Sequence, residues 1–156
     1  MYSASNQNQK NTLYKVRYKE IKDAENILNT QYLGTLTKNQ LCERYFENKI
    51  IFKRAKHVIY ENHLVKIAKI SLKENNIKQF GNLMNKSQKS YSKNFEVSND
   101  NIDLIVDRSL KSSAYGCKLT VWGFGGFTIS LIEENKYNNW YKKMLVYYDK
   151  KKFLKL

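Results

Sequence analysis

The sequence of 156 residues contains no proline, only six glycines, and two each of cysteine and histidine. Cys42 and Cys117 form neither a CxxC pair nor a zinc-ligand pattern, so we expect a reduced protein of the cytoplasm. His57 and His63 are six positions apart, whereas a helical zinc pair has a spacing of four, so we expect ordinary surface or partly buried side chains and no metal site.

No apolar run approaches the roughly 20 residues that span a bilayer. The first residues are polar and predict neither a signal peptide nor membrane association.

Arginine is also scarce, although the chain is strongly basic. There are 28 basic and 14 acidic residues, which gives a net charge of +14. Only four of the basic residues are arginines, and the lysines are spread along the chain. Because arginine is the side chain best suited to phosphate and base recognition, we expect no specific nucleic-acid partner. A basic nucleic-acid-binding module stays open as an alternative, and it would show affinity that falls steeply with salt.

The hydrophobic pattern predicts a single domain over residues 1–156 with helices and a small sheet. Hydrophobic residues make up 42% of the chain and charged residues 27%, an ordinary balance for a globular protein. The order of elements, several helices followed by strand, turn, strand and helix, favours an α+β class. Apolar periodicity and turn residues predict helices at 13–32, 38–48, 50–73, 80–91, 102–110 and 137–148, with strands at 115–120, 127–132 and 153–156. The run Ser98-Asn99-Asp100 is a predicted N-terminal cap.

The two predicted central strands are joined by a glycine cluster, in which Gly123, Gly125 and Gly126 fall within four positions. Such a cluster permits positive φ and a close approach of the backbone to a phosphate, or tight packing of the loop itself. The loop has no Walker lysine and opens no helix after a parallel strand, so neither a P-loop nor a dinucleotide site is indicated. Taken alone, the cluster favours a plain structural hairpin.

Four ordered blocks of the sequence, of which this loop is one, resemble the carboxyl-terminal part of the galactokinases, which are GHMP sugar kinases. The loop block KLTVWGFGGFTI at 118–129 is similar to the family's RMTGGGFGGCTV. The stretches FGNLMNKSQKS, NFEVS and IDLIV, at 80–90, 94–98 and 102–106, resemble FGxLMxxSHxSLxxxFEVSxPxLDxLV. RAKHV with EN, at 54–58 and 61–62, resembles RARHVxxEN, and YKVR at 14–17 resembles YNxR.

The resemblance implies a fold, a reaction and site residues. The fold is the α+β carboxyl-terminal domain of a GHMP kinase, with an antiparallel sheet backed by helices. The intact enzyme uses ATP and Mg²⁺ to convert D-galactose into galactose 1-phosphate. By this resemblance Tyr14 is the sugar contact. The glycine-rich loop that supports the phosphate region comprises Thr120, Gly123, Phe124, Gly125 and Gly126.

The sequence also departs from the family pattern. Val121 and Trp122 replace two loop glycines, Gln88 replaces the histidine of the SHxS block, and Asp100 replaces a proline. No residue matches the family's GEHTDY sugar motif, its GLSSSA phosphate loop or its catalytic aspartate, which all belong to the amino-terminal half. The chain therefore offers no catalytic residue and no ligand for ATP or Mg²⁺, and we expect a separate amino-terminal half as its partner.

These observations predict a galactokinase portion that is inactive alone. Two alternatives within the resemblance stay open at this point. One is a catalytically dead remnant that acts at most as a binding domain, which the missing motifs and the altered loop would fit. The other is an enzyme of the N-acetylgalactosamine kinase type, whose blocks are similar.

Overall fold

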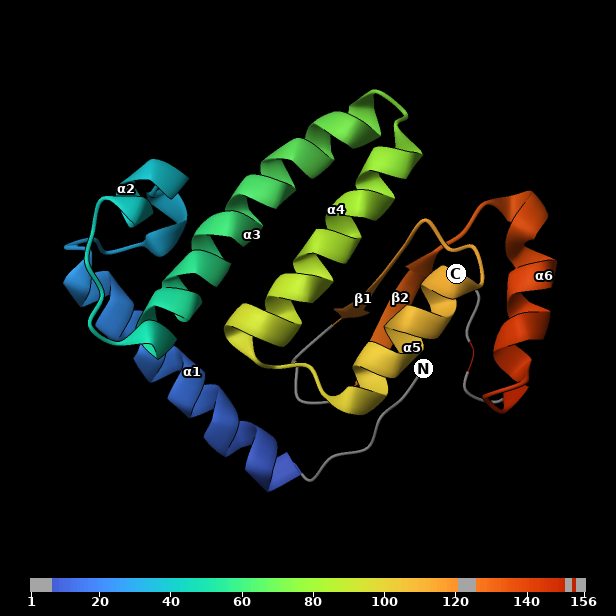
Figure 1. Cartoon of the computed structure of the whole chain (residues 1–156), viewed down its shortest axis with the longest axis horizontal. Helices are drawn as coiled ribbons and strands as arrows, with labels where there is room; N and C mark the ends of the chain where they lie inside the picture. The colour runs from blue at the N-terminus through green and yellow to red at the C-terminus, as the bar shows by residue number, and fades with distance from the viewer. Residues whose placement is uncertain (1–6, 121–125, 151–152, 154–156) are drawn as a thin grey trace.

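The structure is a computed structural model that describes residues 7–120, 126–150 and 153. Helices dominate and a two-stranded antiparallel sheet lies near the centre, so the predicted α+β class is confirmed (Figure 1). The elements are α1 (Gln7–Ile27), the 3₁₀ turn η1 (Leu33–Thr35), α2 (Lys38–Cys42), α3 (Lys49–Lys73), α4 (Ile77–Ser90), the π-helical turn η2 (Tyr91–Phe95), α5 (Asp100–Lys111), β1 (Gly116–Thr120), β2 (Phe127–Leu131) and α6 (Glu134–Leu145).

The first two helices end earlier than the sequence pattern predicts. Helix α1 stops at Ile27 because Asn29 adopts a left-handed backbone with φ 50°, and the Thr30 N–H then bonds the Glu25 carbonyl. Helix α2 ends at Cys42 and not at residue 48. Asn48 is needed in an extended conformation, in which its side chain caps the N-terminus of α3.

The later elements agree closely with expectation. Helices α3 and α4 form an antiparallel hairpin that runs across Figure 1. Helix α5 begins after the cap residue Asn99, whose side chain accepts the Ile102 N–H. Helix α6 is displaced by three residues from the predicted 137–148. Phe153 lies in no strand and stacks edge-on against Trp140 and Tyr141, and the rest of the predicted strand at 153–156 lies outside the described residues.

The π-helical turn η2 is the element that the pattern did not predict. Residues 91–95 continue α4 with a wider turn, and Glu96 then reverses the chain with φ 56°. The Val97 N–H closes this turn on the Tyr91 carbonyl. The turn directs the carbonyls of residues 94–96 toward α1 and α3, where the partly buried Arg17 and the buried Arg54 bind them.

The sheet joins α4 to α5. Its register pairs Gly116 with Leu131 and Thr120 with Phe127. One face carries Cys117 and Leu119 into a cluster with α5, while the outer edge of β1 lies against α4.

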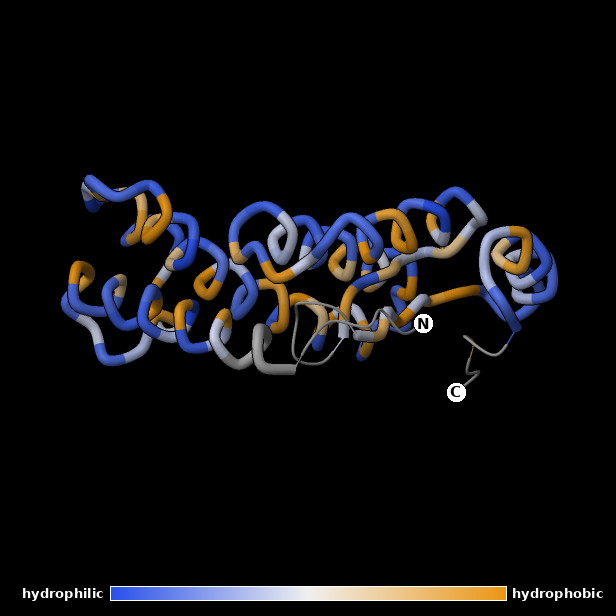
Figure 2. Tube along the Cα trace, turned by 90° about the horizontal axis from the view of Figure 1, so that it is seen from below, coloured by the Kyte–Doolittle hydropathy of each residue, from blue (hydrophilic) through white to orange (hydrophobic). Residues whose placement is uncertain are grey.

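Two separate hydrophobic clusters form the core of this flat molecule (Figure 2). The first joins α1, η1, α2 and α3, and the second joins α5 and β1. Between the two clusters lie buried polar side chains of α3 and α4. Among the described residues, five of these buried polar side chains belong to the candidate functional site described below: Arg54, His57, Ser87, Gln88 and Ser90. Within the described residues, no helix combines the length and the apolar content of a membrane span.

Candidate functional site

Tyr14, the predicted sugar contact, lies on α1 with 56% of its surface exposed. One turn further along the helix, Arg17 joins α1 to the end of η2 and to the residue that follows it. Its Nε donates to the Phe95 carbonyl at 2.6 Å, and its Nη2 donates to the Glu96 carbonyl at 3.3 Å. Residues three apart share a helix face, so the fastening by Arg17 fixes the orientation from which Tyr14 projects.

Arg54, on α3, is almost completely buried and completes this attachment. Its Nε donates to Glu20 Oε2 at 2.7 Å and its Nη2 donates to Glu96 Oε2 at 2.8 Å. Its third nitrogen donates to the Asn94 carbonyl. The hydrogen bond from Arg54 lowers the pKa of the Glu96 carboxyl, and Lys53 adds to this effect. A buried guanidinium in which each of the three nitrogens donates to an acceptor holds α1, α3 and η2 in one arrangement.

His57 lies one turn after Arg54 and is buried, which corrects the expectation of a surface or partly buried residue. Its Nδ1 is 2.9 Å from Ser90 Oγ, and its ring stacks on Phe95 with centroids 4.3 Å apart. Burial, followed by the nearby charges of Lys118 and Arg54, lowers its pKa to about 3. His57 is therefore neutral at physiological pH. Among the described residues no group of three or more His, Cys, Asp or Glu side chains could hold a metal ion.

The outer edge of β1 is capped by side-chain amides of α4. Asn85 donates to the Tyr115 carbonyl at 3.1 Å and accepts the Cys117 N–H at 3.0 Å. Gln88 accepts the Leu119 N–H at 2.8 Å. These amides replace the hydrogen bonds that a third strand would supply, so β1 is not a free edge.

Gln88, at the position where the family has histidine, also binds the start of α5. Its Nε2 donates to Asp103 Oδ1 at 2.9 Å and to Ser98 Oγ at 3.0 Å. Ser92 and Ser98 both donate to the same Asp103 carboxylate at 2.7 Å. Gln88, which departs from the family pattern, therefore has a structural role in which both its side-chain oxygen and its side-chain nitrogen form hydrogen bonds.

A third polar group lies where β1 meets α3 and α4. Lys118 Nζ donates to Ser87 Oγ at 2.7 Å, and Ser87 donates in turn to Glu61 Oε2 at 2.7 Å. Lys118 also lies 4.8 Å from the Tyr91 ring centroid, and burial lowers its pKa. The second carboxylate oxygen, Glu61 Oε1, is buried and has no hydrogen-bond partner among the described residues. This unpaired acceptor is the one unsatisfied position in the group.

Part of the predicted glycine-rich loop is visible at its two ends. Thr120 is the last residue of β1, and Gly126, with φ 137°, precedes β2. Gly123, Phe124 and Gly125 lie outside the described residues, as do Val121 and Trp122. Packing of α1 on α3, of α3 on α4 and of α4 on β1 connects the helix of Tyr14 to the strand that leads into the loop (Figure 1).

Most residues of these polar groups lie in the sequence blocks given above, but the sequence alone does not reveal how they are connected. Arg54, Glu61 and Glu96 all stand in the blocks that resemble the family, yet Glu20 does not. The group around Arg54 had one signal in the sequence. Arg54 stands on the buried face of its helix, where there are few other charged residues.

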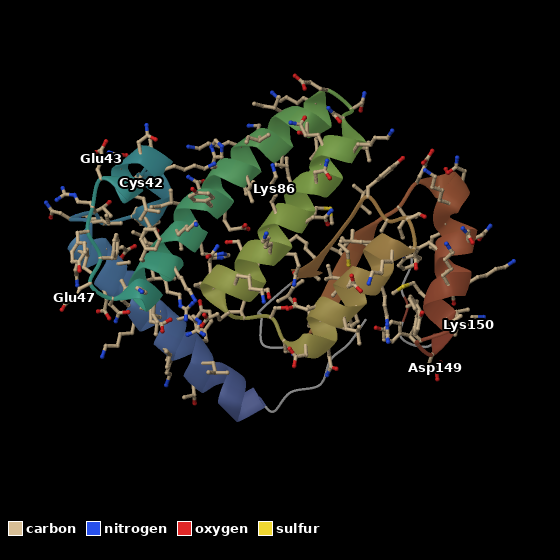
Figure 3. The ribbon with its side chains drawn as sticks, in the orientation of Figure 1. Cys42, Glu43, Glu47, Lys86, Asp149 and Lys150 are labelled. Carbon is tan, nitrogen blue, oxygen red and sulfur yellow. The ribbon has the colours of Figure 1, made fainter. Side chains whose placement is uncertain are left out.

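Other features of the surface lie away from these groups. The cysteines are both free thiols, with Cys42 exposed and Cys117 buried. A shallow depression is lined by exposed residues from Glu47 to Ile50, between α2 and α3. Figure 3 places Cys42 and Glu47 at the end of the molecule opposite Asp149 and Lys150. The depression contains none of the predicted site residues.

Comparison with known proteins gives a consistent relationship. No family model matches the chain. It is 30% identical to a galactokinase of Clostridium acetobutylicum over 94% of its own length, and 34% identical to a galactokinase of Fusobacterium nucleatum over 76%. A crystal structure of Lactococcus lactis galactokinase complexed with galactose matches 95% of the chain with a TM-score of 0.81 and 25% identity. The chain spans 41% of the Clostridium acetobutylicum protein and 40% of the Lactococcus lactis one. The chain therefore belongs to the galactokinase family of GHMP kinases and corresponds to the carboxyl-terminal part of these enzymes.

Proposed function

We propose that this chain serves as the carboxyl-terminal part of a galactokinase that transfers a phosphoryl group from ATP to D-galactose. The observation that carries the proposal is the match to galactokinases over nearly the whole chain, in sequence and in fold. The arrangement of the blocks adds support. The Tyr14 block is bonded to the Phe95-Glu96 segment through Arg17, and the block of α4 is bonded to β1 through Asn85 and Gln88.

In this proposal the chain helps to position the sugar and the phosphate region, and it does not supply the chemical step. Tyr14 contacts the sugar, and the glycine-rich loop of Thr120, Gly123, Phe124, Gly125 and Gly126 supports the phosphate region. Phosphoryl transfer depends on positioning of the triphosphate, the metal and the acceptor hydroxyl. A rigid attachment of α1 and β1 to α3 and α4 would keep both contributions in place, which is the task that Arg54 and Gln88 perform.

ATP and Mg²⁺ belong to the intact enzyme in this proposal. The described residues contain no acidic cluster that fits a divalent cation, and we assign no ligand of ATP or Mg²⁺ to them. Both would be held by an amino-terminal part, as a separate chain or as a preceding segment. We propose the cytoplasm as the location, where ATP is available, and galactose in preference to N-acetylgalactosamine as the acceptor.

The test is a joined protein in which this 156-residue chain follows the amino-terminal part of the Clostridium acetobutylicum galactokinase. Galactose 1-phosphate formation is measured for the joined protein, for the chain alone and for the intact Clostridium acetobutylicum enzyme as a control of the assay. The proposal expects turnover by the joined protein and none by the chain alone. A folded joined protein without turnover on galactose would contradict it, and turnover on N-acetylgalactosamine alone would correct the substrate.

A further inference from the structure

Lys118 connects the strand that leads into the glycine-rich loop with α3, on the far side of α4 (Figure 1). Side chains of a strand alternate between its two faces. Cys117 and Leu119 pack in the cluster with α5, so Lys118 lies on the opposite face of β1. There its ammonium donates to Ser87 of α4, which donates in turn to Glu61 of α3. One chain of hydrogen bonds therefore joins α3 and α4 to β1, close to the end of the strand.

The two charged groups of this chain of bonds are largely withdrawn from water. The side chains of Lys118 and Glu61 are 24% and 19% exposed, and the ammonium lies 3.9 Å from Glu61 Oε2. Removing two charges from water is costly, and apolar side chains of similar volume often stabilise a fold as well as such a pair does. Stability alone therefore explains this pair poorly. Directional hydrogen bonds add a fixed geometry, which apolar contacts do not impose.

The group is incomplete on the Glu61 side. Oε2 accepts the bond from Ser87, whereas Oε1 is buried and has no hydrogen-bond partner among the described residues. The family pattern has arginine at the place of Lys118, and a planar guanidinium has donors for more than one acceptor. The lysine uses its ammonium on Ser87. The connection between Glu61 and β1 in this chain therefore runs through the Ser87 hydroxyl.

We infer that Glu61 is a positioning residue for ATP, which acts through Ser87 and Lys118 by fixing the end of β1 from which the glycine-rich loop starts. This inference rests on the proposed function, in which that loop supports the phosphate region. The helix of Tyr14 has a separate attachment to α3, because Arg54 bonds Glu20 of α1. Loss of the Glu61 connection should therefore weaken the binding of ATP and spare the binding of galactose.

The test measures the dissociation constants of ATP and of galactose by calorimetry in the joined protein. Ser87→Ala removes only the linking hydroxyl, and Lys118→Met removes the donor but keeps most of the apolar stem. We expect each variant to raise the dissociation constant of ATP about 10-fold, as loss of one positioned hydrogen-bond connection would. The constant for galactose should stay within about 2-fold.

Two further variants distinguish positioning from a general loss of structure. Lys118→Arg can keep the bond to Ser87 and should bind ATP at least as tightly as the unsubstituted joined protein. Lys136→Met, at the exposed pair with Glu133, is the matched control and should change neither dissociation constant. NMR of the chain alone reports on the end of β1, where Ser87→Ala should shift the Thr120 amide signal and Lys136→Met should not. Urea unfolding verifies that each variant is folded.

The outcomes separate this inference from the proposed function. Turnover with unchanged ATP affinity in Ser87→Ala and Lys118→Met would overturn the inference and leave the function supported. Equal losses of affinity for ATP and galactose would show a merely structural role for Glu61 and would also overturn the inference. Selective loss of ATP affinity in a joined protein without turnover would support the inference and contradict the function. A folded joined protein that binds no ATP would contradict both.

Discussion

Gly81 of α4 and Gly116 of β1 contact each other backbone to backbone. A Cβ atom on Gly116 would lie 2.5 Å from the Gly81 carbonyl oxygen and 2.8 Å from its Cα. A Cβ atom on Gly81 would lie 2.6 Å from the Tyr115 carbonyl carbon. This approach brings α4 close enough for its amide side chains to reach the β1 edge. The two glycines therefore set the distance on which the Asn85 and Gln88 hydrogen bonds depend.

Replacing Gly116 with alanine should destabilise the chain, because the obstructing atoms belong to a helix backbone and cannot rotate away. We expect Gly116→Ala to lower the free energy of unfolding by about 2–3 kcal/mol, measured by urea unfolding. Gly34→Ala is the control. Its Cβ would meet the Asn62 side chain at an ordinary 3.6 Å, so its effect should stay within about 0.5 kcal/mol. Equal effects of the two substitutions would contradict the close approach.

The sequence predicted most elements because their apolar spacing and caps are local signals. Asn48 and Asn99 cap helices that begin within a residue or two of the predicted positions. The ends of α1 and α2 were wrong, since they depend on a left-handed Asn29 and on the extended Asn48, and periodicity reports neither.

The polar groups of the site were not predictable, because they join residues distant in sequence. Arg54 meets Glu20 and Glu96 only after η2 has turned the chain back, and η2 has no hydrophobic period of its own. The resemblance identified the block that contains Gln88, but it indicated only that this residue replaces the family's histidine and gave it no role. The three hydrogen-bond partners of its side chain, Ser98, Asp103 and Leu119, come together only when α4, α5 and β1 are assembled.

Lys118→Arg should stabilise the chain. A planar guanidinium has more donors than an ammonium, and the resembling family sequence has arginine at this place. Arginine can keep the bond to Ser87 and also donate to Glu61 Oε1, which is buried without a partner among the described residues. We expect the free energy of unfolding to rise by about 1 kcal/mol. Lys136→Arg, at the exposed pair with Glu133, is the control and should change little. A loss of stability in Lys118→Arg would refute this account of the orphaned oxygen.

His57 should make the stability of the chain depend on pH. Its pKa is lowered to about 3 in the folded state, against about 6.5 when unfolded. Below pH 6.5 the unfolded chain therefore binds a proton that the folded chain rejects, and stability falls as the pH decreases. Between pH 7 and pH 5 the loss from this residue is about 2 kcal/mol. Urea unfolding at the two pH values measures it.

The matched variants for this pH dependence are His57→Gln and His63→Gln. The first should remove most of the loss between pH 7 and pH 5, whereas the second, on the exposed part of α3, should retain it. NMR titration of the His57 ring gives an independent reading, and the ring should remain neutral at pH 5. A protonated His57 ring at that pH in the folded chain would disprove the buried, neutral assignment.

Tyr14 should contribute to sugar binding in the joined protein. Tyr18 is the matched control, because it lies one turn further on the same helix and is 57% exposed against 56% for Tyr14. We expect Tyr14→Ala to raise the KM for galactose about 10-fold or more, consistent with loss of a hydrogen bond and contact area. Tyr18→Ala should leave this KM within about 2-fold of the unsubstituted joined protein. Equal changes in both variants would remove Tyr14 from the sugar site.

The most direct measurement is the rate of galactose 1-phosphate formation from ATP and galactose by the joined protein. It requires only that the protein be folded, which circular dichroism and cooperative urea unfolding establish. The account predicts turnover that depends on both parts, with none from the 156-residue chain alone. A folded joined protein that forms no galactose 1-phosphate, beside an active intact Clostridium acetobutylicum enzyme, would contradict the claim that this chain serves as the carboxyl-terminal part of a galactokinase.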